Sequence, residues 1–253
     1  MFKISIFDGD GHAALIKQAG FDSVMIGWRD ADRKEKLLKA RNAGLYIENI
    51  HAVAKNAESI WSDNLDGKYY MKCLINSIDD CREYNIPTMV VHLNNGSMPP
   101  LLNNIGIERL KRIAEKAEQE NINVALENTC ATDCIRYVFD NVSSKKFGFC
   151  YDSGHHNLYA PDRDLLEEYG DRLMAMHLND NFGVDDLHLM PFDGNIDWKK
   201  VTQQFKSIQY NGTIALEISK HGIYKDWLPE KFFEVAFDRA KAILDMMNEG
   251  VSP

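Results

Sequence analysis

Eight short apolar runs that alternate with longer helical stretches are the feature that most limits what this chain can fold into. Such alternation along a whole chain is typical of repeated βα units built around a parallel sheet. Each run consists mostly of Val, Ile, Leu, Met or Phe, as expected for strands that are covered on both faces. The predicted strands span residues 2–7, 22–27, 45–52, 88–93, 123–128, 147–152, 173–180 and 213–218.

The stretches between these runs predict the outer helices. In residues 107–120 and 231–247 apolar side chains return every three or four positions, which is the period of an amphipathic helix. Gly44 and Asn121 stand just before predicted strands, and both residue types commonly end helices. An open doubly wound sheet is the rival fold, but no Gly-x-Gly-x-x-Gly turn follows a strand. The length of 253 residues therefore predicts one α/β domain over residues 1–253, a single (β/α)₈ TIM barrel.

The overall charge bears on the partners of the chain. Its formal net charge of -9 would repel a polyanion, so we expect a small-molecule substrate rather than nucleic acid. No apolar run is long enough to cross a membrane, and Met1 leads into the first strand without a signal sequence. We therefore expect a cytoplasmic protein with no membrane partner, and self-association into a homo-oligomer stays open.

The five cysteines are scattered through predicted helices and strands. In a chain with no secretion signal, the default expectation is reduced thiols that pack in the core. Cys130 and Cys134 could share one helix face, but two cysteines at this spacing are a weak signal for a metal site.

Polar residues at the carboxyl ends of the predicted strands carry the strongest functional signal, because the site of a TIM barrel lies there. Nearly every one of these ends from the third strand onward offers a histidine or a carboxylate. Three further polar residues, two of them histidines, follow in the loops. The strand-end residues are His51, His92, Glu127, Asp152, His177 and Glu217, and the loop residues are His155, Asp186 and His188.

A single histidine in an apolar strand is more often a hydrogen-bonded core residue than a metal ligand. Several carboxylates in one barrel mouth, however, would repel one another and would be costly to desolvate without cations. Imidazole and carboxylate groups without thiolate suit Mn²⁺ or Zn²⁺, with Co²⁺, Fe²⁺ or Mg²⁺ as alternatives. The combined pattern therefore predicts a divalent-metal site built from Glu127, Asp152, His177 and Glu217.

Trp28 and Arg29 stand just past the second predicted strand. An aromatic side chain and a guanidinium at this position could bind a sugar or a phosphate, so both are predicted substrate-binding residues. The alternative interpretation is that Trp28 fills the rim of the barrel.

Four segments around the predicted metal ligands resemble the xylose-isomerase-like barrel superfamily. This superfamily includes sugar epimerases, inosose dehydratases, hydroxypyruvate isomerases and endonuclease IV. The resemblance covers nearly the whole chain. It implies that Glu127, Asp152, His177 and Glu217 bind one Mn²⁺-type ion and that the two glutamates also transfer protons. It further implies a catalytic role for His155, which would orient the substrate or a ligand. The segments are Val124-Ala125-Leu126-Glu127-Asn128, Phe149-Cys150-Tyr151-Asp152-Ser153-Gly154-His155, Met176-His177-Leu178-Asn179-Asp180 and Ala215-Leu216-Glu217.

The chain also departs from the sugar 3-epimerase pattern, which places an arginine shortly after the strand-seven histidine, since residues 179–186 contain none. Asp186 and His188 stand there instead and resemble endonuclease IV, a trinuclear zinc enzyme. With His51, His92 and His155 added, the chain has candidates for additional ions. Two hypotheses result: an isomerase or epimerase of a small carbohydrate that works through an enediolate, with His51, His92 and His188 binding substrate, or a multinuclear zinc phosphodiester hydrolase.

Overall fold

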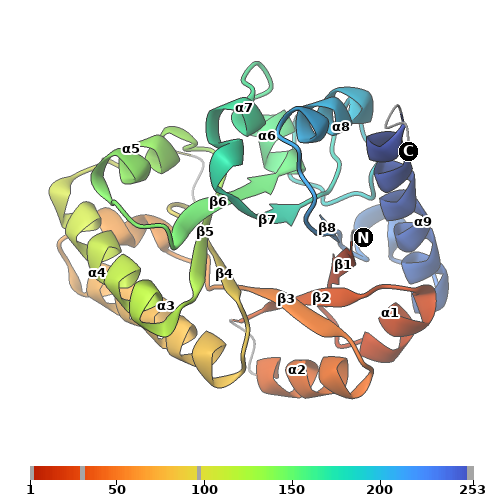
Figure 1. Ribbon diagram of the computed structural model, residues 1–253, viewed down its shortest axis with the longest axis horizontal. Helices are drawn as coiled ribbons and strands as arrows, with labels where there is room; N and C mark the ends of the chain where they lie inside the picture. The colour runs from red at the N-terminus through yellow and green to blue at the C-terminus, as the bar shows by residue number, and fades with distance from the viewer. Residues whose placement is uncertain (1–2, 29–31, 96–97, 250–253) are drawn as a thin grey trace.

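All eight predicted strands form, and they pair in parallel in the order β7-β6-β5-β4-β3-β2-β1-β8. A computed structural model describes residues 3–28, 32–95 and 98–249 of the chain. In Figure 1 the strands surround the centre of the molecule and helices cover their outer side. The strands are β1 (Ile4–Phe7), β2 (Ser23–Gly27), β3 (Tyr46–His51), β4 (Thr88–Val91), β5 (Asn123–Glu127), β6 (Phe147–Asp152), β7 (Leu173–His177) and β8 (Ile214–Leu216).

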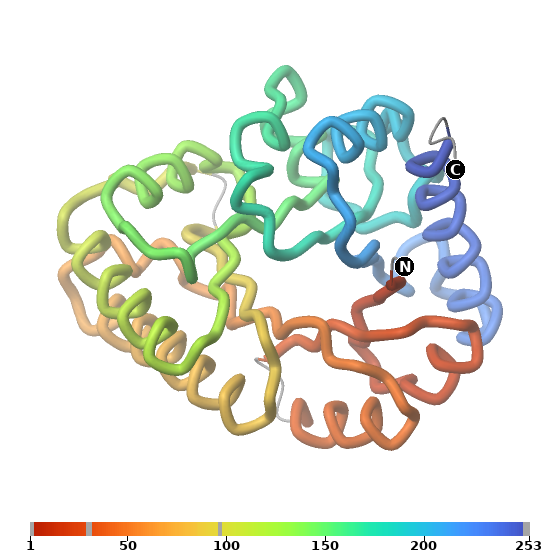
Figure 2. The backbone as a smooth tube through the Cα atoms, viewed as in Figure 1, coloured from red at the N-terminus to blue at the C-terminus, as the bar shows by residue number. Residues whose placement is uncertain are grey.

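The barrel closes in two steps at its last strand. β8 pairs with β1, so the N-terminal strand and the last strand lie side by side, as Figure 2 also shows. On its other edge, β8 meets the chain just after β7 through the parallel bridge between Leu178 and Leu216. Leu178 donates its backbone N–H to Ala215 at 2.8 Å, and Glu217 donates to Leu178 at 3.0 Å. The predicted (β/α)₈ TIM barrel is confirmed, and the open doubly wound sheet is excluded.

The amphipathic stretches form the outer helices as predicted. Residues 107–120 and 231–247 lie within α4 and α9, and Asn121 ends α4 in the left-handed conformation at φ 58°. Three 3-10 helices are also present: η1 (Ala57–Trp61), η2 (Gly170–Arg172) and η3 (Gly222–Tyr224). The α-helices are α1 (Ala13–Ala19), α2 (Arg33–Asn42), α3 (Leu65–Glu83), α4 (Asn104–Glu120), α5 (Asp133–Asn141), α6 (Ser153–Tyr159), α7 (Leu165–Tyr169), α8 (Trp198–Ser207) and α9 (Pro229–Asn248).

Several strands end earlier than the apolar pattern predicts. β4 stops at Val91, so His92 follows the strand, and β8 stops at Leu216, so Glu217 follows it. β7 was expected to reach residue 180 but ends at His177. Beyond that point Leu178 forms a single bridge to Leu216, and Asp180 forms a single bridge to Leu189. The early ends leave the polar side chains at the rim of the barrel.

Successive side chains of β5 point alternately into the barrel and outward to the helices. Leu126 is fully buried in the large cluster that includes the helices, whereas its neighbour Ala125 belongs to a small inner cluster with Val90, Cys150 and Ala175. Successive strand residues point to opposite faces, so Glu127 shares the inward face of Ala125. The barrel interior is therefore filled by small side chains next to the carboxylates.

Cys81, Cys134 and Cys150 pack in the core as predicted, whereas Cys73 and Cys130 are only half-buried. All five cysteines are free, and burial raises the pKa of the Cys150 thiol to about 12. Cys130 lines the main cavity of the protein, where the side-chain amide of Asn94 donates to its sulfur at 2.9 Å. Within residues 3–28, 32–95 and 98–249, no helix has the length and apolar character needed to span a membrane.

The substitution Leu126→Ala tests the outward face of β5. We expect it to lower the free energy of unfolding by about 2–5 kcal/mol, because it leaves a cavity in close-packed surroundings. Leu38→Ala is the control, since Leu38 is 57% exposed on α2 and its loss should change stability by less than about 0.5 kcal/mol. Urea denaturation measures both variants. Equal stability of the two would contradict the packing described for Leu126.

Candidate metal centre

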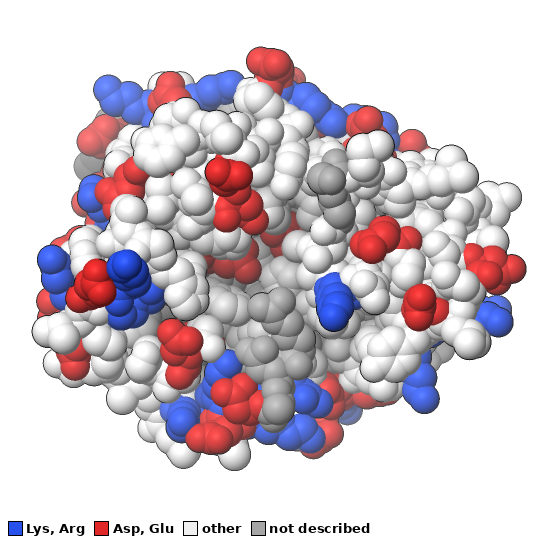
Figure 3. Space-filling model, turned by 180° about the vertical axis from the view of Figure 1, so that it is seen from behind, with Lys and Arg blue, Asp and Glu red and all other residues white. Residues whose placement is uncertain are grey.

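A cavity of about 650 Å³ opens where the strands end and the βα loops begin. Figure 3 shows a hollow on this protein with carboxylate side chains deep inside it. Its lining includes Glu127 and Glu217, and among the described residues of the lining Lys220 is the only lysine or arginine. The cavity is thus acidic, open to solvent and large enough for a small polar molecule.

Glu127, Asp152, His177 and Glu217 form the four-residue cluster at this site. Each offers one ligand atom, and the four atoms all lie within 4.8 Å of one another. His177 Nδ1 lies 3.3 Å from Glu127 Oε2 and 3.1 Å from Glu217 Oε2. The side chains come from the ends of β5, β6 and β7 and from the residue after β8, and the least buried of them, Glu217, is only 8% exposed.

The polar atoms of this cluster lack the hydrogen bonds that buried groups normally make. Both carboxylate oxygens of Glu127 and both ring nitrogens of His177 are buried without a hydrogen-bond partner, since their 3.1–3.3 Å contacts are not aligned as hydrogen bonds. An unsatisfied buried polar group costs about 1–3 kcal/mol. Carboxylate and imidazole donors that converge without partners fit a divalent cation of the Mn²⁺ or Zn²⁺ type.

The electrostatics of the cluster agree with a site for a cation. Burial and the neighbouring carboxylates raise the pKa of Asp152 to about 7, although His155 opposes the shift. Burial alone would lower the pKa of His177, but Cys150, Glu217 and Glu127 hold it well above its usual value. Burial would likewise raise the pKa of Glu127, but His177 and His92 hold it well below normal. In the absence of an ion, protons on histidines offset the buried negative charge.

Two asparagines support Asp152 and were not predicted from the sequence. Asn179 Nδ2 donates to Asp152 Oδ2 at 2.8 Å, and the backbone N–H of His155 donates to Asp152 Oδ1 at 2.6 Å. Asn128 accepts from the backbone N–H of Asp152 at 2.7 Å and donates to its carbonyl at 2.8 Å. Both asparagines stand one or two residues after a strand-end ligand, which is the signal that could have identified them.

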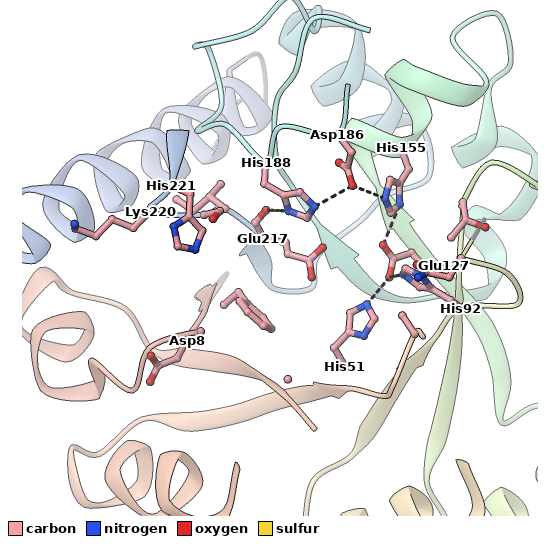
Figure 4. A pocket seen from close by; sticks show the side chains of 18 of the residues that line it. Asp8, His51, His92, Glu127, His155, Asp186, His188, Glu217, Lys220 and His221 are labelled. Carbon is pink, nitrogen blue, oxygen red and sulfur yellow. Dashed lines mark hydrogen bonds and ion pairs between the residues drawn. The ribbon is translucent and has the colours of Figure 1, made fainter. Parts of the chain in front are cut away.

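His51 and His92 lie against Glu127, as Figure 4 shows. Their Nε2 atoms are 3.3 and 3.2 Å from Glu127 Oε2, and the two rings meet edge to face at 4.8 Å. Glu127 Oε1 is approached by His155 Nδ1 at 3.1 Å. The structure thus brings two of the three predicted substrate-binding histidines, and His155, to the same carboxylate.

Asp186 joins His155 to His188 on the other side of the cavity. Its Oδ2 atom lies 3.2 Å from His155 Nε2 and 3.2 Å from His188 Nε2, as the dashed lines in Figure 4 show. His188 also contacts the backbone carbonyl of Glu217 through Nδ1 at 2.9 Å. The residues proposed for additional ions are therefore contiguous with the four-residue cluster.

The structure places Trp28, a predicted substrate-binding residue, against α3. Trp28 is 5% exposed and does not line the cavity, and its indole nitrogen donates to Asp80 Oδ2 on α3 at 2.6 Å. Its side chain packs against the helices because the apolar ring is buried there and the indole N–H, its single donor, has an acceptor there. Arg29, the other predicted contact after β2, lies outside the described residues.

The barrel fold agrees with a comparison of the sequence with known families. The chain belongs to the xylose isomerase-like TIM barrel family, whose model matches residues 13–245. This confirms the resemblance drawn from the sequence segments.

The relatives of this chain carry the names of different activities or of none. The uncharacterized protein y4fM of Sinorhizobium fredii is 33% identical over 161 residues, which are 58% of this chain and 52% of that protein. A probable endonuclease 4 of Mycoplasma mycoides subsp. mycoides is 29% identical over 164 residues, 56% of this chain and 53% of the relative. This chain therefore spans about half the length of both. An inosose isomerase of Bacillus velezensis is 22% identical over 236 residues, 83% of each chain.

Solved structures share the fold over the full length. A D-tagatose 3-epimerase-like protein superposes with a TM-score of 0.77 and 22% identity over 99% of this chain and 100% of that chain. The IolI protein with a bound zinc atom superposes with a TM-score of 0.78 and 15% identity over 100% of both chains. At these identities the likeness establishes the architecture alone.

Asp152→Asn and His177→Asn test the assignment of ligands. We expect each to lower the affinity for added Zn²⁺ by about tenfold or more while the fold survives, because each removes one donor from the cluster. Asp162→Asn, in the loop between α6 and α7, is the control. Elemental analysis and titration with Zn²⁺ measure the effect. Full occupancy and unchanged affinity in both variants would rule out these two residues as ligands.

Binding of the ion should also depend on pH. The pKa of His177 is raised, so a proton occupies the nitrogen that must coordinate the metal and has to leave on binding. Affinity for Zn²⁺ should therefore increase from about pH 6 to about pH 8, with release of about one proton or more per ion. Calorimetry in buffers of different ionisation enthalpy counts the protons. Binding without proton release would contradict the role of His177.

Proposed function

We propose that this protein is a divalent-metal-dependent isomerase or epimerase of a small carbohydrate or a carbohydrate derivative. The observation that carries the proposal is the placement of two carboxylates, Glu127 and Glu217, which both contact Nδ1 of His177 at the wall of one cavity. An acidic cavity suits a neutral polyol better than an anionic substrate.

The chemistry of such a reaction divides between the ion and the side chains. A bound divalent ion would polarise the carbonyl and hydroxyl oxygens of a ketose and so acidify the adjacent C–H bond. One of the two glutamates removes that proton to give an enediolate. The other glutamate, once it has taken up a proton from water in the open cavity, donates it to the opposite face in an epimerisation, or to the neighbouring carbon in an isomerisation. Burial would raise the pKa of Glu217, but His177 holds it at about 2, so this carboxylate is ionised and able to accept a proton.

Three further side chains would bind the substrate in this scheme. His51 and His92 contact Glu127 from the side of β3 and β4, and His188 borders Glu217. These rings would donate hydrogen bonds to hydroxyl groups and keep the carbon skeleton between the two glutamates. His155 contacts both Glu127 and Asp186 and would orient the carboxylate that carries the proton.

The names of the similar proteins support this choice. An inosose isomerase matches 83% of the chain, and an epimerase-like protein and a zinc-binding protein share the fold. The metal in the proposed enzyme is of the Mn²⁺ or Zn²⁺ type, in accord with the histidine and carboxylate donors.

A phosphodiester hydrolase with several metal ions is the second candidate. The contact of Asp186 with both His155 and His188 favours it, because these groups extend the donor set beyond what one ion uses. A probable endonuclease 4 is among the relatives. Against it stands the composition of the cavity, in which Lys220 is the only lysine or arginine among the described lining residues. Binding of a phosphate backbone relies on several cationic contacts.

Glu127→Gln and Glu217→Gln test the two-carboxylate mechanism. Each should lower turnover by about two orders of magnitude or more, the scale expected for the loss of a general base. The control is Glu48→Gln, because Glu48 lies on β3 and does not line the cavity. Ketopentoses, ketohexoses and inososes are incubated with the metal-loaded protein in deuterium oxide, and NMR detects deuterium next to the carbonyl. Undiminished exchange in either glutamine variant would refute the mechanism.

The double variant Asp186→Asn, His188→Asn separates the two candidates. For an isomerase with one ion, it should keep the ion at the four-residue cluster and mainly raise KM, because the loop over the substrate is disturbed. For a multinuclear hydrolase, it should remove one ion and abolish kcat. Elemental analysis counts the ions, and cleavage of duplex DNA at an abasic site measures the hydrolase. Loss of an ion in the variant, together with cleavage by the parent protein, would establish the second candidate in place of the first.

A further inference from the structure

Asp180 carries an unusually large number of hydrogen bonds for a single side chain outside the four-residue cluster. Its carboxylate is fully buried and accepts four of them. Oδ1 accepts from the backbone N–H groups of Asn181 at 2.9 Å and Ile196 at 3.2 Å. Oδ2 accepts from the backbone N–H of Phe192 at 3.0 Å and from the indole nitrogen of Trp198 at 2.9 Å. One side chain thus ties together the beginning and the end of the loop formed by residues 181–196.

The middle of this loop is held by the backbone of the same residue. Asp180 and Leu189 exchange two backbone hydrogen bonds of 2.8 and 2.9 Å, and Leu189 directly follows His188. His188 and Phe192 have left-handed backbone conformations, with φ of 47° and 75°. Such conformations are unfavourable for residues with a Cβ atom and persist only where neighbouring contacts impose them. The bonds to Asp180 supply those contacts on both sides of His188.

The loop passes so close to Asp180 that one position requires glycine. A Cβ atom on Gly194 would lie 2.2 Å from Asp180 Oδ1 and 2.3 Å from the carbonyl oxygen of Asn181. No side chain fits at these distances. The approach of Gly194 is therefore a second observation, independent of the hydrogen bonds, that the loop is built around this carboxylate.

The same loop delivers Asp186 and His188 to the cavity. Asp186 Oδ2 lies 3.2 Å from both His155 Nε2 and His188 Nε2, and both loop residues line the cavity beside Glu217. Asp186 and its neighbours on the loop are otherwise exposed, so little packing holds them in place. The contacts that fix the loop lie instead at its base, on Asp180.

We propose that Asp180 is the positioning residue that sets the loop of residues 181–196 so that Asp186 and His188 meet His155 at the edge of the metal-site cavity. A carboxylate is required because all four partners are N–H donors, and an asparagine would present an NH₂ group to two of them. The catalytic use of Asp186 and His188 rests on the proposed function. The positioning itself is a property of the chain without ion or substrate.

Histidine-ring NMR on the full-length, metal-free protein tests the assignment through Asp180→Asn. In the parent protein, the Nε2 signals of His155 and His188 should report hydrogen bonding to Asp186. In Asp180→Asn both signals should move to the positions that they take in Asp186→Asn. The amides of Phe192 and Ile196 should exchange with solvent at least about tenfold faster, with no change in the strands.

Asp197→Asn is the matched control, because Asp197 also accepts two backbone N–H groups, those of Lys199 and Lys200, at the start of α8. Asparagine caps a helix as well as aspartate does, so the ring signals should stay as in the parent. A folded Asp180→Asn protein with unchanged ring signals would overturn the proposal. If this variant does not fold, Gly194→Ala decides, because it leaves the carboxylate in place and displaces the loop. Shifted ring signals in Gly194→Ala support the assignment, and unchanged ones reject it. Since neither ion nor substrate is present, a failed isomerase assay leaves this result unaffected.

Discussion

Three carboxylates buried beside one another at the mouth of the barrel are the constraint on which the rest of this structure depends. Glu127, Asp152 and Glu217 are each at most 8% exposed, and their desolvation is costly unless positive charge faces them. Closure of the sheet brings them together, because β8 pairs with β1 and bridges to the chain after β7. The histidines around them supply the positive charge when no ion is present, and their donor atoms suit a metal when one is.

The sequence predicts the fold well because the periodic pattern reports the repeated unit directly. The runs over residues 123–128 and 147–152 become β5 and β6 with shifts of one residue or none. Prediction fails at β7, where the predicted strand runs to residue 180 but the pairing with β6 ends at His177. An apolar residue such as Leu178 is buried in either conformation, so hydrophobicity cannot mark the end of the strand.

The four-residue cluster was predictable for a related reason. The residues that hold the cluster and its neighbouring loop in place, Asn179 and Asp180, were not predictable. Strand ends in a barrel converge, so a carboxylate or histidine at that position has a defined neighbourhood before any coordinates exist. Trp28 occupies an equivalent position but turns to the helices, since an aromatic ring is stable on either side of a strand. The roles of Asn179 and Asp180 depend on hydrogen bonds to Asp152 and to a loop that ends near residue 196. Neither partner can be identified from spacing along the chain.

The choice between one ion and several turns on how the negative charge is distributed. The four-residue cluster carries three carboxylates within reach of one cation, whereas Asp186 stands apart and already contacts two histidines. Burial would lower the pKa of His188, a partner of Asp186, but Asp186 and Glu217 raise it to about 10. Asp186 and His188 thus balance each other's charge, whereas the three carboxylates of the four-residue cluster face only one histidine within that cluster, His177. A divalent ion would therefore occupy the four-residue cluster first, and an additional ion beside Asp186 would have to displace the proton that His188 holds there.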